Sequence, residues 1–209
     1  QEKEETKEAK PILRTTLSNM LKGIPPTYIA DEEKQEQTEG QNNENIEPQK
    51  QQELHQYTIT DENLGAGGLK VKYQNNVEAI RLLKKIESEN RLATPEEQET
   101  LSRYVGWGGL SNAFDESIQE WQNEYNELKE ILTETEYSDA RESTLTAFYT
   151  PPVVISAMYE ALSNMGFSKG NILEPSCGIG NFIGRLPENM QESNVYGVEL
   201  DSISGRIAK

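Results

Sequence analysis

The chain has 209 residues, enough for one or two domains, and a formal net charge of -16. A segment this acidic is poorly suited to be a main phosphate-gripping surface, so any grip on nucleic acid must come mostly from elsewhere. A single cysteine, Cys177, excludes an internal disulfide framework, and a single histidine, His55, leaves no cluster with metal-ligand spacing.

No apolar run is long enough to cross a bilayer, and no basic-then-apolar signal segment is present, so we expect a soluble protein in the reducing cytoplasm. A catalytic pair of Cys177 and His55 is a poor interpretation, because the two lie in a glycine turn and in a polar tract. The chain begins at Gln1 and not at Met, so we expect it to be part of a longer protein.

Residues 1–56 are rich in Glu, Gln, Asn and Lys and poor in aromatic residues. This composition predicts a disordered acidic and polar linker, because it offers too little apolar surface to offset the entropy of ordering. Leu13, Leu17 and Leu21 share a helical face that ends at Gly23, so a short partner-dependent helix is expected there.

Residues 57–147 are predicted to form a helical domain. The glycine-rich stretch at 65–68 lacks the Lys-Ser or Lys-Thr of a P-loop, which favours a structural turn over a phosphate cradle. Apolar residues recurring at threes then predict a helix from about Asn76 to Glu89.

The next helix has a clear start, because Thr94 is placed to cap it and Glu97 to complete a capping box. It should end at the glycines around Trp107, whose side chain we assign to core packing; stacking on a base or ligand is the alternative. Apolar residues at threes and fours further predict one long helix from about Asp115 to Glu134.

Two later stretches carry the chemistry. Thr150 is placed as a helix cap with Pro151 at the first helical position, and this helix start either is only structural or faces a small anionic group. From Asn171 a short buried strand should end near Glu174, because Pro175 cannot donate a ladder hydrogen bond.

Gly178 and Gly180 then allow positive φ and close approach of the backbone to a ligand at the start of the next helix; an ordinary glycine turn is the alternative. A second buried strand is predicted at 195–198 and is followed by Glu199, close to the spacing of about 20 residues at which an acidic residue meets a ribose. Ile183 occupies the position of the third glycine of a dinucleotide fingerprint. The carboxylate of Glu174 disfavours a phosphorylated cofactor and favours one with an ammonium group.

These motifs resemble, in order and spacing, the cofactor half of adenine-specific DNA methyltransferases: Phe-Tyr-Thr-Pro-Pro at 148–152, Glu-Pro-Ser-Cys-Gly-Ile-Gly-Asn-Phe at 174–182 and Gly-Val-Glu-Leu-Asp at 197–201. The stretches at 65–68 and 104–110 look like the large methylase-helicase and antirestriction proteins of phages and conjugative elements. The resemblance implies S-adenosylmethionine as cofactor, DNA as partner and a possible helicase domain in the parent chain. The fold it implies is α/β, a Rossmann-like methyltransferase domain at 148–209, truncated after its second strand and preceded by the helical domain, so that the segment itself is predominantly helical.

The resemblance further implies that Thr150 meets the methionine carboxylate, Glu174 the ammonium group and Glu199 the ribose hydroxyls. The full set of cofactor-binding residues that it implies is Thr150, Glu174, Pro175, Cys177, Gly178, Gly180, Glu199 and Leu200, with Leu200 against the adenine ring. It implies no metal ligand.

The family's Asn/Asp-Pro-Pro-aromatic motif, which holds the flipped adenine, does not occur in this sequence. No catalytic residue is therefore assigned, and we expect the segment alone to be inactive while its parent methylates adenine in DNA. Two other interpretations stay open. One is an antirestriction or protein-interaction module on a methyltransferase-like scaffold, and the other is a methyltransferase acting on RNA, protein or a small molecule.

Overall fold

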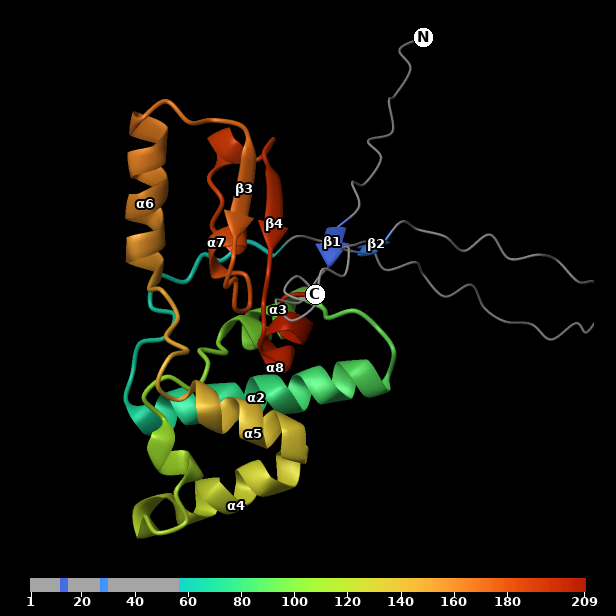
Figure 1. The fold of residues 1–209 in the computed structure, drawn as a ribbon, viewed down its shortest axis with the longest axis vertical. Coiled ribbons are helices and arrows are strands. Elements are labelled where there is room, and N and C mark those ends of the chain that lie inside the picture. Colours follow the sequence, from blue (N-terminus) through green and yellow to red (C-terminus); the bar gives the residue numbers. More distant parts are fainter. Residues whose placement is uncertain (1–11, 15–26, 30–56) are drawn as a thin grey trace, which may run out of the picture. The chain divides into compact units, whose positions relative to one another are not determined.

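The computed structural model describes residues 12–14, 27–29 and 57–209 (Figure 1). The chain divides into two units, Gln1–Glu53 and Leu54–Lys209. His55 and most of the predicted linker lie outside the described residues.

In the first unit, β1 (Ile12–Arg14) pairs antiparallel with β2 (Thr27–Ile29). Leu13 therefore belongs to a strand, and the helix predicted to include it does not start there. The β-branched and aromatic residues of the two segments favour an extended backbone, and a helix this short gains little from propensity alone. Leu17 and Leu21 lie outside the described residues.

The second unit begins with a helical part. Its elements are α2 (Leu69–Ser88), α3 (Pro95–Ser102), the 3-10 turns η1 (Ser111–Phe114) and η2 (Gln119–Trp121), α4 (Gln122–Ile131) and α5 (Glu134–Ser143). Helix α2 starts well before the predicted Asn76. Its first turn carries the exposed Leu69 and Val71, so apolar periodicity gave no sign of it. The capping box of Thr94 and Glu97 is confirmed.

The single long helix predicted from Asp115 to Glu134 is wrong. Asp115 accepts hydrogen bonds from the amide and the hydroxyl of Ser117, and such local bonds compete with helix formation. A second capping box, between Thr133 and Glu136, starts α5 as a separate helix. The apolar periodicity from Phe114 to Leu132 continues through the 3-10 turns because these turns and α4 face the same core.

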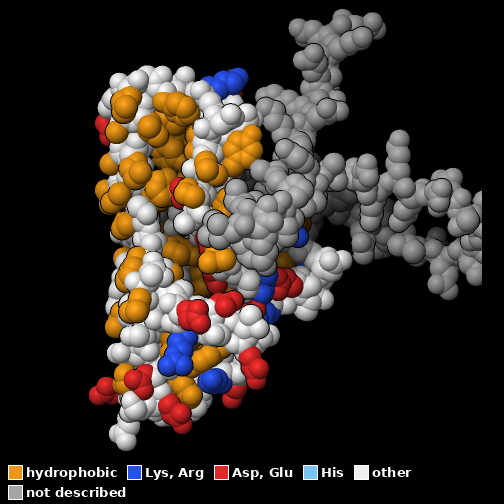
Figure 2. All heavy atoms as spheres, viewed as in Figure 1, with side chains coloured by type: hydrophobic (Ala, Val, Ile, Leu, Met, Phe, Trp, Pro, Cys, Tyr) orange, Lys and Arg blue, Asp and Glu red, His pale blue; other side chains and the backbone are white. Residues whose placement is uncertain are grey.

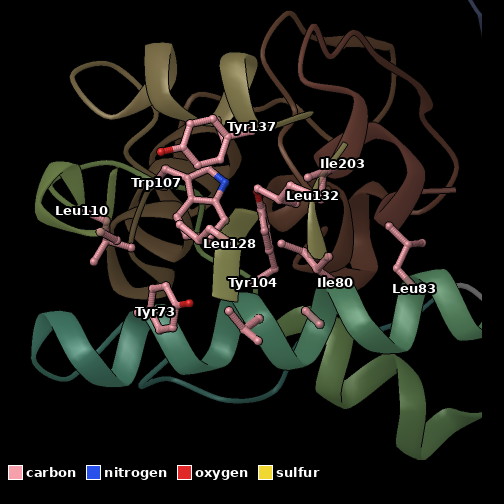
Figure 3. Packing of buried hydrophobic residues seen from close by; sticks show 14 of the residues in the cluster. Tyr73, Ile80, Leu83, Tyr104, Trp107, Leu110, Leu128, Leu132, Tyr137 and Ile203 are labelled. Atoms are coloured by element: carbon pink, nitrogen blue, oxygen red, sulfur yellow. The ribbon is translucent and has the colours of Figure 1, made fainter. Parts of the chain in front are cut away.

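Trp107 lies at the centre of that core and is 1% exposed. Its ring meets Phe114 at 5.2 Å and Tyr73 at 6.3 Å between centroids, both edge-on (Figure 3). Helices α2, α4 and α5 all contribute to this cluster, as does Ile203 from the end of the chain. Core packing, and not base stacking, is thus the role of Trp107.

The second part of the unit is smaller. It contains α6 (Pro152–Asn164), β3 (Asn171–Glu174), α7 (Asn181–Gly184), the 3-10 turn η3 (Glu188–Met190), β4 (Asn194–Gly197) and α8 (Ser202–Ile207). Strands β3 and β4 pair in parallel, with Asn171 opposite Asn194 and Glu174 opposite Gly197. The Leu54–Lys209 unit is thus mostly helical with a small two-stranded parallel sheet, which agrees in part with the predicted α/β class.

Both strands lie where they were predicted, but they are not buried as predicted. Ile172 and Val195 pack with α6, which lies beside β3 in Figure 1, while Leu173 is 63% and Tyr196 37% exposed. Alternate strand residues face opposite sides of a sheet, and the described residues cover one side only. Apolar content predicted the strands, but burial depends on a covering layer.

The two parts of this unit are joined by ion pairs. Arg206 of α8 bonds Glu87 of α2 and Glu136 of α5, and Arg185 bonds Glu62. The boundary expected near residue 147 therefore separates sequence motifs within one compact unit, and it stays a prediction as a domain boundary. In the described ranges no helix is long and apolar enough to cross a membrane.

Candidate functional site

The carboxyl ends of β3 and β4 lie side by side because the strands are parallel and in register. The Val198 amide donates to the Glu174 carbonyl at 2.9 Å, and the Cys177 amide donates to the Val198 carbonyl at 3.0 Å. These bonds extend the ladder into the turn after each strand. They hold the glycine turn against the 198–201 loop, as expected for a ligand site at the ends of parallel strands.

Gly178 and Gly180 have φ values of +55° and +91°, which confirms the predicted left-handed backbone. Space also favours a glycine at the first position, because a Cβ on Gly178 would lie 3.0 Å from Cζ of Tyr149. Gly180 caps α7, and its amide donates to the Cys177 carbonyl at 2.8 Å. The turn is therefore tight and packed against an aromatic ring.

The carboxylate of Glu199 is fixed by backbone amides. Its Oε2 accepts from Gly178 at 2.6 Å, and its Oε1 accepts from Leu200 and Asp201 at 2.8 Å each. The glycine turn and the residue predicted to meet a ribose are thus in direct contact. Leu200 follows with 72% of its surface exposed, so its side chain is available beside this carboxylate.

Burial, followed by the charges of Glu199 and Glu174, raises the pKa of Cys177 to about 11. A raised pKa keeps the thiol protonated near neutral pH, which disfavours a nucleophilic role for Cys177. Burial also raises the pKa of Glu174, partly offset by a hydrogen bond from the Ser176 amide. No cluster able to hold a metal ion occurs among the described residues.

Thr150 does not cap α6. Pro151 holds the N-cap position and Pro152 is the first helical residue, so the predicted placement is wrong. The reason is local, since a residue before proline avoids helical dihedrals and Pro151 stays extended at ψ 146°. Because neither proline has an N–H group, this helix start presents few amides to an anion.

Tyr149 is the site residue that we did not assign from sequence. Its ring touches Gly178, its hydroxyl is 2.7 Å from Oγ of Ser204, and a Cβ on Gly106 would lie 2.9 Å from its Cε1. Tyr149 thus connects the 104–110 loop of the helical part to the glycine turn. Its place beside Thr150 in a resembling motif was the available signal.

The 104–110 loop is hydrogen-bonded to the segment that precedes α6. The Gly108 amide donates to the Ala147 carbonyl at 3.0 Å, and a Cβ on Gly108 would lie 2.4 Å from that oxygen. The glycines around Trp107 therefore allow the core and the site segment to meet. Gly65 and Gly67 have φ values of +77° and +110°, as a tight structural turn requires.

The structure therefore brings five predicted residues to one place: Glu174, Cys177, Gly178, Gly180 and Glu199. Pro175 lies in the same turn and Leu200 at its rim, while Thr150 lines a neighbouring cavity with Tyr149 and Asn181. Their roles toward a ligand remain predictions.

Replacing Gly178 with alanine should lower the free energy of unfolding by about 1 to 2 kcal/mol, because the left-handed backbone is strained for a residue with a Cβ. Chemical denaturation followed by circular dichroism measures this. Gly205→Ala in α8 is the matched control, since its Cβ would meet nothing closer than 3.9 Å. Equal stability of the two variants would contradict the left-handed backbone of Gly178.

Comparison with known proteins gives a distant and partial similarity. The chain is 34% identical over 83 residues to the Type II methyltransferase M.CvrRI of Paramecium bursaria Chlorella virus XZ-6E, covering 40% of this chain and 20% of that protein. The chain thus spans about a fifth of the length of the relative that it matches. No family model and no solved structure matches the chain.

Proposed function

We propose that this chain is the cofactor-binding portion of a DNA methyltransferase that transfers a methyl group from S-adenosylmethionine to the amino group of adenine. The observation that carries the proposal is Glu199, whose carboxylate follows β4 and bonds the Gly178 turn that follows β3. A carboxylate at this place suits the hydroxyls of a ribose. The similarity to a type II methyltransferase supports the same class of reaction.

The residues present fit such a cofactor. A carboxylate oxygen has two acceptor sites, and Oε2 of Glu199 accepts one bond within the described part of the chain, which leaves a site for a ribose hydroxyl. The exposed Leu200 offers apolar surface to the adenine ring, and Glu174 offers a negative charge to the ammonium group. The side-chain oxygen of Asn181 is buried and accepts no hydrogen bond from the part of the chain that the structure describes, as expected of a group that awaits a donor.

The bound cofactor would supply an activated methyl group on a positively charged sulfur. The residues of this chain would bind and orient it, and no covalent enzyme intermediate is needed, because positioning alone lowers the barrier to transfer. The acceptor base would be flipped out of the DNA duplex and held by an Asn/Asp-Pro-Pro-aromatic motif that this sequence lacks. Because this chain has a net charge of -16, DNA would be bound mainly by other parts of the parent protein. The resemblance suggests that these parts include a helicase domain.

We expect Glu199→Ala to weaken binding of S-adenosylmethionine by about 1 to 3 kcal/mol, the cost of losing hydrogen bonds to a charged group. Isothermal titration calorimetry of the chain, and of its parent protein, measures this. The exposed Glu130 on α4 supplies the control, since Glu130→Ala removes one negative charge, as Glu199→Ala does, and leaves the site intact.

Because Glu199 also bonds three backbone amides, thermal unfolding of each variant must accompany the titration. A folded Glu199→Ala chain with the affinity of the Glu130→Ala chain would remove Glu199 from the site. If neither the chain nor its parent takes up S-adenosylmethionine, the proposed function is wrong.

A protein-interaction or antirestriction module is the second candidate, and one observation favours it. Large apolar side chains gather on α6 and the neighbouring sheet, where Figure 2 shows hydrophobic surface: Val153, Val154, Met158, Leu162, Met165 and Leu173 are all exposed. Absence of cofactor binding together with capture of a protein by this surface would favour the module. An Asn-Pro-Pro-aromatic motif elsewhere in the parent chain would favour the enzyme.

A further inference from the structure

We propose that the helical part completes the cofactor site, with Lys72 and Asn181 binding the amino-acid end of S-adenosylmethionine. This inference rests on the proposed function and adds to it two binding residues, one of them from α2. Its basis is a cavity between the two parts of the Leu54–Lys209 unit, together with the charge and the unpaired polar atom that line it.

The cavity has a volume of about 120 Å³. On one side it is lined by the helical part, including Gly65, Lys72 and Tyr104, and on the other by Tyr149, Thr150, Pro151 and Asn181. Pockets for whole drug-sized ligands start at about 300 Å³, so this cavity suits an end group and not a nucleoside. Tyr149 touches Gly178, which places the cavity next to the Glu199 carboxylate.

Lys72 is the charged residue in the lining of this cavity, within a chain whose net charge is -16. Two other lysines of α2 are paired, Lys70 with Glu124 at 2.6 Å and Lys84 with Glu136 at 2.7 Å, and the remaining one, Lys85, is exposed to solvent. Lys72 is half-buried and has no ion pair with a described residue. A partly buried cation without an opposite charge favours an anionic ligand group, and the Thr150 hydroxyl can donate to the same group.

Asn181 contributes the opposite preference. Its Oδ1 is buried and has no hydrogen-bond partner among the described residues, and it lines the same cavity. A buried acceptor left unpaired costs free energy, which a ligand N–H group would recover. The Lys72 cation and the Thr150 hydroxyl suit a carboxylate, and the unpaired acceptor of Asn181 suits an ammonium group. An α-amino acid carries both of these groups.

The direction of the sheet agrees with this placement. The carboxyl ends of β3 and β4 point toward the helical part in Figure 1, and Tyr149 connects the turn after β3 to Gly106 of that part. The nucleoside end would lie at Glu199 and Leu200, and the amino-acid end would reach the cavity across Tyr149.

The test compares two ligands on the intact chain by isothermal titration calorimetry. S-adenosylmethionine carries the amino-acid end, and 5′-methylthioadenosine lacks it. Lys72→Met should weaken S-adenosylmethionine binding about 10-fold to 100-fold, the range for a lost charged hydrogen bond, and leave 5′-methylthioadenosine binding unchanged. Asn181→Leu should act in the same selective way with a smaller loss of a few-fold, as for a single neutral acceptor.

Lys85→Met is the matched control, because Lys85 lies exposed on the same helix and outside the cavity, and it should change neither affinity. Lys72→Met binding both ligands as the unaltered chain does would overturn the inference while the proposed function stands. Equal weakening of both ligands would also overturn it, since Lys72 would then act on the fold or the nucleoside. Binding of neither ligand by the unaltered chain or by its parent protein would overturn the proposed function and this inference together.

Discussion

Replacing Trp107 with alanine should lower the free energy of unfolding by about 3 to 5 kcal/mol, the range for removing a large aromatic side chain from a packed core. Trp107 is 1% exposed and contacts rings from α2, from the 3-10 turn η1 and from its own loop. Since small domains are stable by only about 5 to 15 kcal/mol, the variant should be close to unfolding at room temperature. Urea denaturation followed by circular dichroism measures the loss.

Two further variants make this result specific. Trp107→Phe keeps an aromatic ring and removes an indole N–H that bonds no described residue, so it should cost clearly less than alanine. Leu145→Ala, at a side chain that is 80% exposed, should change stability by less than about 0.5 kcal/mol. A loss below about 1 kcal/mol for Trp107→Ala would mean that the ring does not organise this core and would reopen its assignment to stacking on a base.

Helix starts and strand ends that depend on neighbouring residues could be predicted from the sequence. The start of α3 at Thr94 needed only a cap, a proline and a glutamate in order, and the end of β3 needed only Pro175. The helix predicted from Asp115 begins only at Gln122, because the local bonds between Asp115 and Ser117 outweigh the apolar periodicity there. Periodicity reports which residues face the core and does not show whether the backbone between them is continuous.

Contacts between distant segments could not be predicted in the same way. The glycine at position 178 indicated that another group lies close to the backbone there, because glycine leaves room for one. Nothing in the sequence identified that group as Tyr149. The pairing of Glu199 with the Gly178 amide was anticipated only as a shared site. The cavity beside Thr150 depends on Lys72 and Tyr104 of the helical part, whose approach follows from packing of the whole unit.

The site therefore depends on the contact between the two parts, and the strongest charged link in that contact is Glu136. Its side chain is 8% exposed and pairs with Lys84 at 2.7 Å and with Arg206 of α8 at 2.8 Å. Burial acts to raise its pKa, but hydrogen bonds from Lys84, the Thr133 amide and Arg206 outweigh burial and lower the pKa to about 2. Both cations keep about a third of their surface exposed, so water can partly replace the lost carboxylate.

We expect Glu136→Gln to lower the free energy of unfolding at pH 7 by about 3 kcal/mol, the lower end for breaking a buried ion pair. Because the folded pKa lies below the ordinary value of 4.5, the stabilisation is complete above about pH 4.5 and is lost as the pH falls toward about 2. The difference between the unaltered chain and Glu136→Gln should therefore shrink across that window in urea titrations at several pH values. Glu134→Gln, at an exposed position in the same turn of α5, should differ little from the unaltered chain at any pH. A constant difference between the unaltered chain and Glu136→Gln from pH 7 to pH 2 would show that the carboxylate does not hold α8 to the helical part through its charge.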